Sequence, residues 1–287
     1  MSAPKRIFIT GISSSILSGL CKSLQEENHE LIGLSRNKFV RKGIQIIQGD
    51  LQDPSSWNKE VQHCDLIIHA AAITHTHDES KYYSVNYEAS KKLIDACPKS
   101  AGFVFISSRT AGEKSGAYGH SKWMAEEYLK ENHARYIILS PSEVYGSVKK
   151  EGIESLVHDA QHKKIIPYPA GVKSPLSPIH VDDLTRLMKN WILDKDWPKE
   201  SVILNGPEYF LYPDLIKAIA KASGNNPFLI PIPRFAMNIL AKVSALMPGK
   251  LPFTSDQVAR LYAPKKTVRM DDKSMRTIHD YVKLLIA

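Results

Sequence analysis

Long hydrophobic runs are absent from this sequence: no stretch approaches the ~20 apolar residues that a membrane-spanning helix needs. The apolar run near the start, Ile7–Ile9, is too short for the core of a signal peptide, so we do not expect export by that route. Cysteine is scarce, and Cys21, Cys64 and Cys97 match no metal pattern. They predict buried thiols of a reducing compartment, and we therefore expect a cytoplasmic protein.

Negative charge is also in short supply, since 38 lysines and arginines face 30 acidic residues and leave a net charge of +8. Such a balance suits nucleic acid, an anionic membrane surface or acidic ligands. The basic residues are scattered in pairs and no aromatic interleaving or nucleic-acid motif accompanies them, so we expect no nucleic-acid partner. We interpret the pairs as solvated surface with a modest attraction for phosphorylated ligands.

Short β-branched runs alternate with amphipathic segments of helical period through the first half of the chain. The expected strands are 6–10, 30–35, 44–48, 66–69, 103–107 and 136–139, and the expected helices include 16–26, 87–96 and 121–131. Such alternation predicts an α/β fold with a doubly wound parallel (Rossmann) sheet. Prolines cluster after Gly146. We therefore expect a nucleotide-binding domain over 1–146 and a smaller α/β substrate region over 147–287, interleaved with the first.

A turn between the first strand and its helix is the first candidate site. A tight turn there presents backbone N–H groups and a helix N-terminus to a pyrophosphate, and glycine normally dominates it. Here Gly11 stands alone, because Ser14 or Ser15 replaces the second expected glycine and Leu17 replaces the third. We assign the turn to cofactor binding through Gly11, Ser13, Ser14, Ser15 and Ile16. An ordinary serine-rich helix cap explains the same residues equally well.

Three later strand ends carry further cofactor candidates. Arg36 follows the second strand, where an NAD enzyme usually has a carboxylate, and an arginine suits the 2′-phosphate of NADP. A surface arginine at a strand end is the alternative. Asp50 and Leu51 follow the third strand, where the aspartate can meet the adenine amino group. The small residues Ala70, Ala71 and Ala72 let the chain pass close to a cofactor.

Ser108, Tyr118 and Lys122 form the candidate reactive centre. The tyrosine and lysine are four apart and share a helix face, and the serine ends a strand just before them. For a tyrosine to work near neutrality its pKa must fall by about 3, roughly 4 kcal/mol of differential stabilisation. A lysine, a helix N-terminus and the positive nicotinamide ring can supply this together. Tyrosine and lysine at this spacing also occur as a plain surface pair, but less often behind a serine-tipped strand.

These motifs, in this order, resemble the landmarks of the extended short-chain dehydrogenase/reductase family, the NAD-dependent epimerase/dehydratases. The resemblance covers nearly the whole chain and rests on Thr10-Gly11, Gly49-Asp50-Leu51, His69–Ala72, Val85-Asn86, Ser107-Ser108, Tyr118 with Lys122, Pro141–Gly146 and His180–Leu184. The C-terminal part is similar to a subgroup that includes the nucleotide-binding accessory subunit of respiratory complex I.

The resemblance implies roles for these residues. Tyr118 is then the acid/base, Lys122 orients it and binds the nicotinamide ribose, and Ser108 bonds the reacting oxygen. Asn86, and the turn from Pro141 to Val144, would belong to the cofactor site. Hydride passes between a substrate carbinol carbon and the nicotinamide, and we expect NADP, with NAD as the other candidate.

The expected substrate is a small molecule, a nucleotide-diphosphate sugar in the sugar-modifying members. We assign Arg109, Tyr145 and His180 to its cleft, with a satisfied histidine at a domain seam as the alternative for His180. Arg109-Thr110 replaces the Asp-Glu pair of the sugar dehydratases, which disfavours water elimination. No metal is expected. A homodimer stays open, by analogy with the family alone.

Two hypotheses about function follow. The first is a reductase or epimerase acting on a nucleotide sugar, with Arg36 favouring the reduction of a ketosugar. The second is a non-catalytic nucleotide-binding module of a larger assembly, which the depleted glycine turn and the C-terminal resemblance favour. The intact serine, tyrosine and lysine set opposes it.

Overall fold

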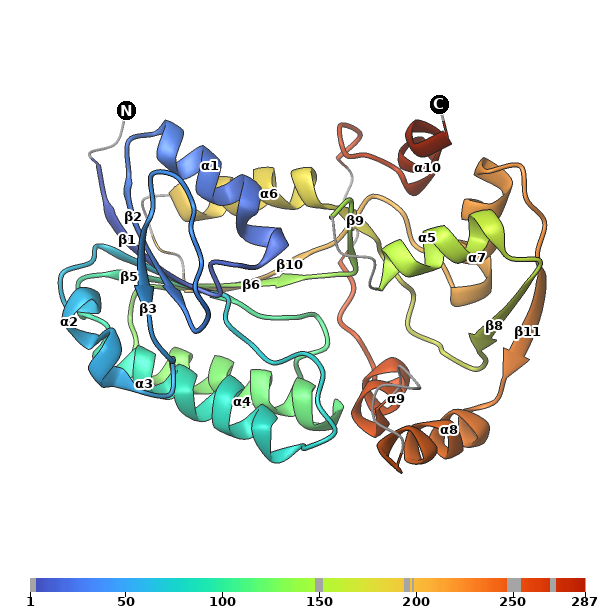
Figure 1. The fold of residues 1–287 in the computed structure, drawn as a ribbon, viewed down its shortest axis with the longest axis horizontal. Coiled ribbons are helices and arrows are strands. Elements are labelled where there is room, and N and C mark those ends of the chain that lie inside the picture. Colours follow the sequence, from blue (N-terminus) through green and yellow to red (C-terminus); the bar gives the residue numbers. More distant parts are fainter. Residues whose placement is uncertain are drawn as a thin grey trace. The chain divides into compact units, whose positions relative to one another are not determined.

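A computed structural model describes residues 4–147, 152–193, 197, 199–246, 254–268 and 272–286 (Figure 1). The chain forms two compact units. Unit 1 comprises Met1–Ser140 and Thr185–Val202, and unit 2 comprises Pro141–Leu184 and Ile203–Ala287. The boundary that the sequence suggests after residue 146, where prolines begin to cluster, stays a prediction.

Unit 1 is built on a seven-stranded sheet of order β10-β6-β5-β4-β1-β2-β3. Its strands are β1 (Arg6–Thr10), β2 (Glu30–Ser35), β3 (Gln45–Gln48), β4 (Leu66–His69), β5 (Gly102–Ile106), β6 (Tyr136–Pro141) and β10 (Glu200–Leu204). The described registers of neighbouring strands are parallel, as in Ile9 opposite Ile68. The predicted doubly wound sheet is confirmed, and its order reverses between β1 and β4, where open α/β sheets bind ligands.

Helices cover both faces of this sheet (Figure 1). One face carries α1 (Ser18–Glu26) and α6 (Val181–Leu193), and the other carries α2 (Asn58–Val61), α3 (Ala89–Ala96) and α4 (Gly116–Asn132). Strands enclosed in this way must be apolar on both faces. β5 is buried along its whole length, and its Phe103 and Phe105 pack in one cluster with Leu93 of α3 and Leu129 of α4.

Three helical segments differ from the sequence expectation, and one of them is α4, which begins at Gly116 rather than at residue 121. The first helix is preceded by a 3₁₀ turn, η1 (Ser15–Leu17), so that α1 begins only at Ser18. The helix expected from residue 87 begins earlier, as a π-helix, η3 (Tyr82–Glu88), that continues into α3. π-Helical turns are uncommon and frequently lie at functional sites. A shorter 3₁₀ turn, η2 (Pro54–Ser56), precedes α2.

Unit 2 has two small parallel sheets and five further helices among the described residues. Its strands are β7 (Val144–Tyr145) paired with β9 (Ile179–His180), and β8 (Ile165–Pro169) paired with β11 (Phe228–Ile232). Its helices are α5 (Ile153–His162), α7 (Tyr212–Ala222), α8 (Arg234–Leu246), α9 (Ser255–Tyr262) and α10 (Ile278–Ile286). One core joins α5, α7 and α10, and a separate small cluster joins α8 to α9.

Cys21, Cys64 and Cys97 are buried free thiols, as predicted. Within the described part of the chain, no helix combines the length and the hydropathy that crossing a bilayer requires.

Candidate functional site

The turn after β1 lies against the segment after β4. Gly11 has φ +70°, and a Cβ atom on it would lie 2.7 Å from the backbone nitrogen of Ala71 and 2.8 Å from the carbonyl carbon of Ala70. No side chain fits this contact, and the left-handed backbone favours glycine as well. The turn and the small residues Ala70–Ala72 therefore meet at the point where the strand order reverses.

The serines of this turn do not cap a helix with their side chains. Ser14 is the N-cap residue of η1 and forms no side-chain capping bond, while its backbone N–H donates to the Gly11 carbonyl at 2.9 Å. Ser13 is exposed, and Ser14, Ser15 and Ile16 are half-buried. The structure therefore gives no support to the helix-cap alternative for Ser14.

Leu17 occupies the place of the third expected glycine and is fully buried. It ends η1 and precedes α1, so one turn of tighter helix separates the glycine turn from the α-helix. The sequence suggests that a leucine here moves the helix outward. In the structure, the chain accommodates Leu17 by forming a 3₁₀ turn before the α-helix, and the leucine side chain packs into the core.

The candidates at the other strand ends have different surroundings. Arg36 is exposed one residue after β2. The Asp50 carboxylate accepts the Gln52 N–H at 2.9 Å, so it stabilises its own turn, and Leu51 is buried. These positions accord with their predicted roles without testing them.

A chain of hydrogen bonds runs beneath the glycine turn. Thr10 Oγ1 lies 2.6 Å from His69 Nδ1, and His69 Nε2 lies 2.7 Å from Ser90 Oγ. The Ser90 hydroxyl donates to the Asn86 carbonyl at 2.8 Å, and Thr10 Oγ1 accepts the Ala71 N–H at 3.2 Å. His69 is wholly buried, and this burial, helped by the nearby Lys122 charge, holds its pKa well below the usual range.

Asn86 lies within the π-helical turn and fastens a neighbouring loop. Its side-chain oxygen accepts the Ile73 N–H at 2.8 Å, and its side-chain nitrogen donates to the Ile73 carbonyl at 3.0 Å and the Ser121 hydroxyl at 3.4 Å. Ser121 is on α4, between Tyr118 and Lys122. The hydrogen-bonded chain therefore links the turn after β1 to the helix that carries the reactive candidates.

Several contacts tie the segment after β5 to α4. The Lys122 ammonium donates to the Ile106 carbonyl at 2.9 Å, and the Ser107 hydroxyl donates to the Glu126 carboxylate. Farther along, the Gly112 N–H donates to the Gly119 carbonyl at 3.2 Å. A Cβ atom on Gly119 would lie 2.5 Å from the Thr110 carbonyl oxygen, so the strand-end turn packs closely on the helix beside Tyr118.

Ser108 belongs to this turn. Its hydroxyl lies 2.9 Å from the Thr110 hydroxyl and accepts the Thr110 N–H at 3.2 Å. Tyr118, from the first turn of α4, is buried and makes an edge contact with the Tyr82 ring at 5.9 Å. Arg109 is also buried. The three predicted reactive residues thus belong to two segments that are bonded to each other.

Lys122 is the charged member of the set and is 1% exposed. Its ammonium lies 3.9 Å from the centre of the Phe105 ring. Burial lowers its pKa from 10.5 to about 7, an effect that the Glu126 carboxylate partly opposes. A lysine in this state changes charge near neutral pH, where an ordinary lysine does not.

Unit 2 holds the other predicted residues. Pro141 ends β6, and Val144 is half-buried at the start of β7. Tyr145 is fully buried, its hydroxyl donates to the Arg276 carbonyl at 2.9 Å, and burial raises its pKa. In this structure Tyr145 fastens the C-terminal segment, and its predicted role toward a substrate is untested.

His180 is packed in an aromatic cluster of unit 2, with ring centres 5.3 Å from Tyr145 and 5.5 Å from Tyr281. Arg276 Nη1 lies 3.2 Å from both ring nitrogens of His180, a geometry of stacking on the ring face rather than of one in-plane hydrogen bond. Burial and the arginine lower the His180 pKa. Gly146, at φ +83°, leaves room for this ring, since a Cβ there would lie 2.3 Å from His180 Nε2.

Sequence reasoning missed the partners of this cluster. The Glu154 carboxylate accepts the Tyr281 hydroxyl at 3.0 Å and the Gly146 N–H, and Arg276 pairs with Asp182 at 2.9 Å. These residues come from segments that are far apart in the sequence. Spacing within the chain carries no signal of such contacts.

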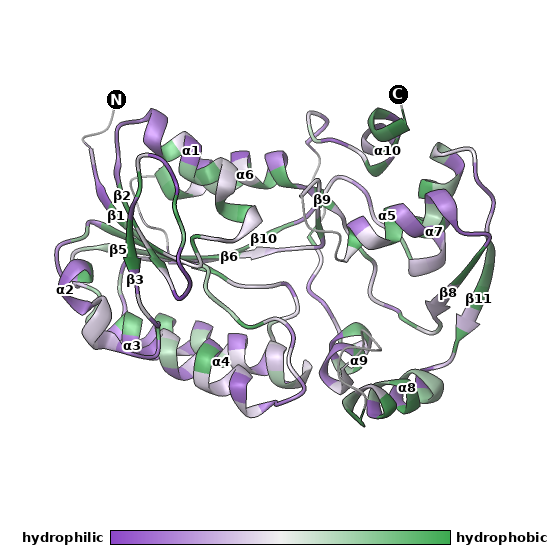
Figure 2. Cartoon of the chain, in the orientation of Figure 1, coloured by the Kyte–Doolittle hydropathy of each residue, from purple (hydrophilic) through white to green (hydrophobic). Residues whose placement is uncertain are grey.

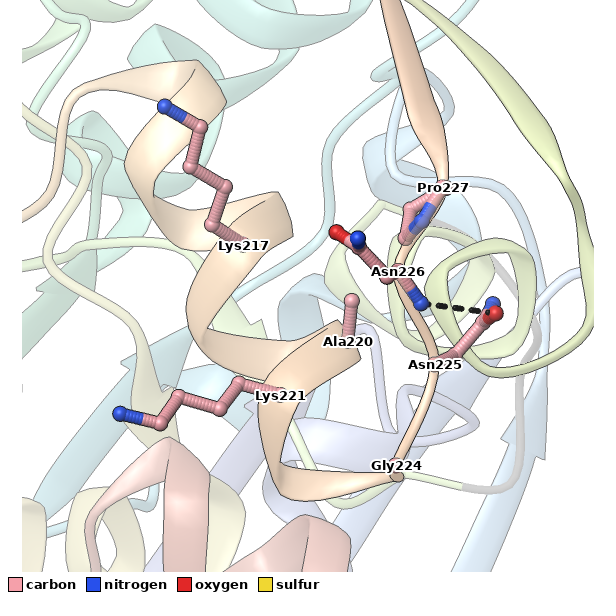
Figure 3. Close-up of a pocket in the computed structure, with 7 residues that line it drawn as sticks. All are labelled: Lys217, Ala220, Lys221, Gly224, Asn225, Asn226 and Pro227. Carbon is pink, nitrogen blue, oxygen red and sulfur yellow. Dashed lines mark hydrogen bonds between the residues drawn. The ribbon is translucent and has the colours of Figure 1, made fainter.

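A surface pocket of about 490 Å³ lies elsewhere in unit 2, at the end of α7 (Figure 3). It is lined by Lys217, Ala220, Lys221, Gly224, Asn225, Asn226 and Pro227. The two lysine side chains extend away from the asparagines, and the Asn226 N–H donates to Asn225 Oδ1 at 2.9 Å (Figure 3). Because no polar groups converge there, we assign it no ligand. Among the described residues, no three His, Cys, Asp or Glu side chains are grouped to hold a metal ion.

Three features are typical of the class of dinucleotide-binding, short-chain dehydrogenase-like proteins. They are the order of the strands, the glycine turn at the point where that order reverses, and the hydrogen bonds between the segment of Ser108 and the helix of Tyr118 and Lys122. A family model described as "NAD dependent epimerase/dehydratase family" matches residues 7–203, and the chain belongs to that family. NAD(P) is the cofactor typical of this family.

The chain has distant relatives among known proteins. The chain is 24% identical over 226 residues to the mouse protein "NADH dehydrogenase [ubiquinone] 1 alpha subcomplex subunit 9, mitochondrial", a match that covers 76% of this chain. The chain spans only 59% of the length of that relative. The predicted resemblance to this subgroup is confirmed as a distant similarity.

Solved structures share the fold. The crystal structure of gox2253 aligns with 97% of this chain, and the alignment includes 96% of the gox2253 chain. The TM-score is 0.74 and the sequence identity is 21%. The UDP-glucose 4-epimerase of Thermus thermophilus, solved in complex with NAD, covers 79% of this chain and 86% of its own, with a TM-score of 0.64 and 19% identity. At these identities the likeness shows the fold alone.

Proposed function

We propose that this chain is an NAD(P)-dependent reductase or epimerase that moves hydride at a carbinol or keto carbon of a nucleotide-diphosphate sugar. The observation that carries the proposal is the attachment of the Ser108 segment to the Tyr118 helix. Three hydrogen bonds join the segment to the helix, and their donors are the Lys122 ammonium, the Ser107 hydroxyl and the Gly112 N–H. A catalytic set needs side chains held at fixed separations, and these bonds hold the two backbone segments that carry them.

The proposed cofactor site fits the residues present. Gly11 lets the turn pack directly on the backbone of Ala70 and Ala71, and the serines beside it bring hydroxyls near the N-terminus of η1. Buried Leu17 is the departure from the usual glycines. When bound, the dinucleotide accepts or donates the hydride. Arg36, exposed after β2, would bind a 2′-phosphate, and for this reason we favour NADP over NAD.

The chain's own residues would manage the proton. In the oxidising direction Tyr118, as phenolate, takes the proton of the substrate hydroxyl while the carbon loses hydride, and in reduction it returns that proton. A charged Lys122 one helical turn away stabilises the phenolate. The Ser108 hydroxyl donates to the substrate oxygen and holds it beside the phenol. Positioned proton transfer of this kind contributes about 10²–10⁴-fold to a rate.

A nucleotide sugar is proposed as substrate because one solved protein of the same fold is a UDP-glucose 4-epimerase. Buried Arg109 follows Ser108 directly and is the cation that we propose for binding the substrate. The absence of an Asp-Glu pair at 109–110 disfavours elimination of water.

A second candidate function is a non-catalytic nucleotide-binding module of a larger assembly. The observation that favours it is the similarity to a protein named as a subunit of such an assembly, together with Leu17 in the glycine turn. The hydrogen bonds between the Ser108 segment and the helix of Tyr118 and Lys122 favour catalysis instead. Burial of a lysine costs free energy, and a structural module has no need of a lysine at such a site.

Cofactor binding is tested by thermal melting with NADP, NADPH, NAD and NADH. A ligand at 100 times its Kd stabilises the fold by about 2.7 kcal/mol. We expect the NADP pair to shift the melting temperature, Arg36→Glu to abolish that shift, and Lys38→Glu, an equal charge change two residues away, to retain it. A larger shift with the NAD pair would contradict the preference. No shift with any of the four dinucleotides, in protein free of bound cofactor, would contradict the proposed hydride transfer.

Catalysis is tested by following the absorbance of the reduced nicotinamide with nucleotide ketosugars. Tyr118→Phe should lower the rate by about 10²–10⁴-fold without loss of cofactor binding. Tyr128→Phe on the same helix is the matched control, because that hydroxyl donates outward to Asp95 at 2.6 Å. Equal rates for Tyr118→Phe and the wild type would refute the proposed role of Tyr118.

A further inference from the structure

Helix α8 has apolar side chains on two separate faces. One face packs against α9, with Met237 and Ala241 buried against Val258. The other face points into solvent, where Phe235 is 68%, Ile239 57% and Leu246 83% exposed. These three recur at helical spacing, with Val243 between them. Figure 2 shows α8 as hydrophobic over most of its length.

The strand before α8 adds a second exposed apolar surface. β11 leads into α8 through Pro233, and its Phe228 is 70% exposed. In the register with β8, Phe228 lies opposite the exposed Ile165. Apolar surface of this kind, continuous along one segment of chain, marks an interaction surface more often than scattered single residues do.

The charge of this segment identifies the kind of partner. From Leu215 to Ser255 the sequence contains no aspartate or glutamate, and its basic residues are Lys217, Lys221, Arg234, Lys242 and Lys250. On α8 itself Lys242 is exposed, and the Arg234 guanidinium lies 4.9 Å over the Tyr262 ring. An apolar face with an exposed lysine, on a helix that has no acidic residue, complements a surface that is both apolar and anionic.

We propose that the exposed face of α8 lies on the surface of an anionic phospholipid bilayer. A helix of 13 residues is too short to cross a bilayer but long enough to lie in its interfacial plane. Phe235, Ile239, Val243 and Leu246 enter the boundary between headgroups and acyl chains, while Lys242 meets lipid phosphates. The proposal is independent of the chemistry assigned to Tyr118.

A second copy of the chain fits this face less well. Pairing of two exposed α8 faces would bring Lys242 of each copy toward that of the other, with no carboxylate on either helix to neutralise them. An anionic lipid surface attracts the same charges. The physical preference for lipid therefore comes from the missing acidic residues, since the apolar side chains alone suit either occupant.

The test is flotation of the full-length protein with phosphatidylcholine vesicles, with and without phosphatidylglycerol. We expect binding to the anionic vesicles only, weakening as salt is added. The double substitution F235S/I239S should weaken this binding by roughly ten-fold or more, because two large side chains no longer leave water. Lys242→Gln should weaken it by about five-fold, the equivalent of about 1 kcal/mol per basic residue at such a surface.

Val40→Ser supplies the matched control, because Val40 is 84% exposed in unit 1 and belongs to no such surface. It should bind vesicles as the wild type does. Circular dichroism checks that every variant is folded. Absence of binding to both vesicle types, or equal binding by F235S/I239S, would overturn the proposal. A dimer that F235S/I239S dissociates, without vesicle binding, would overturn it in favour of a second copy.

Discussion

The Lys122 ammonium donates a hydrogen bond to the Ile106 carbonyl at 2.9 Å while lying 3.9 Å from the centre of the Phe105 ring. Both contacts are to the last two residues of β5, immediately before the Ser107-Ser108 segment. They partly offset the loss of water around a charge that is almost fully buried. The same lysine therefore joins the helix of Tyr118 to the strand of Ser108 and remains poorly solvated.

Replacement of Lys122 by methionine should change how stability depends on pH. The pKa of Lys122 is lowered to about 7 in the folded protein, from 10.5. Between these values the unfolded chain binds the proton and the folded chain does not, so the free energy of unfolding rises with pH. The destabilisation is complete below pH 7 and is relieved toward pH 10.5. Lys122→Met should flatten this rise, measured by thermal melting at a series of pH values.

Lys130→Met on the same helix is the control for that measurement. Its side chain is one-third exposed, and its ammonium pairs with Glu127 at 2.7 Å. It should leave the rise in stability above pH 7 in place. Parallel stability curves for the wild type and Lys122→Met would show that the lysine retains its ordinary proton affinity.

Gly11→Ala should destabilise the protein more than a left-handed backbone alone explains. An L-residue in that backbone region costs roughly 1–2 kcal/mol. Gly171 has a similar φ of +77°, but a Cβ atom added there would have no neighbour within 4 Å, whereas one on Gly11 would meet Ala71 at 2.7 Å. The excess of Gly11→Ala over Gly171→Ala in denaturant unfolding therefore measures the clash. Equal losses would mean that the turn moves freely away from Ala71.

Leu17→Ala tests whether the missing glycine was replaced by a core residue. Leu17 is fully buried, and truncation of a buried leucine costs about 2–5 kcal/mol. We expect a loss in that range by denaturant unfolding. Leu17→Gly should lose still more, even though it restores the usual glycine pattern. A neutral or stabilising Leu17→Gly would instead show that the leucine only obstructs the turn.

His69→Gln should reduce the sensitivity of the fold to acid. The pKa of His69 in the folded protein is well below 6.5. Below pH 6.5 the histidine therefore binds a proton in the unfolded chain but stays neutral in the folded chain. Stability therefore falls as pH decreases from about 6.5. His69→Gln removes this contribution, at a cost of about 1–3 kcal/mol at pH 8 if Thr10 or Ser90 loses its partner. Melting curves at pH 5 to 8 check it, with the loop substitution His77→Gln as control.

The sequence alone predicts the sheet and the family. Strands such as 6–10 and 66–69 are short, β-branched and enclosed between helical segments, and a parallel sheet has to be built from segments of that kind. Motif order then identifies the family, because Gly11, Ser108, Tyr118 and Lys122 each follow a particular strand. The local sequence pattern is sufficient here, because each motif consists of residues that lie close together in the chain.

Contacts between distant segments lie outside that information. The bonds of Asn86 to Ile73 and of Tyr145 to Arg276 join residues whose separation along the chain carries no signal. The substrate role that the sequence assigns to Tyr145 stays a prediction, and the sequence did not indicate that this side chain is buried and bonded to the C-terminal segment. It also gave no warning of the π-helical turn at Tyr82–Glu88 that positions Asn86.

The amino-acid pattern by itself determined the parallel sheet, the family and the order of the candidate site, because those depend on periodicity and on residues adjacent in the chain. Only the tertiary structure decided how Leu17 is accommodated, how poorly Lys122 is solvated and which face of α8 is left open to solvent. Each of these depends on burial. Burial is a property of the neighbours that a residue acquires in space, and α8 shows this most plainly, since its Met237 is covered while its Phe235 is not.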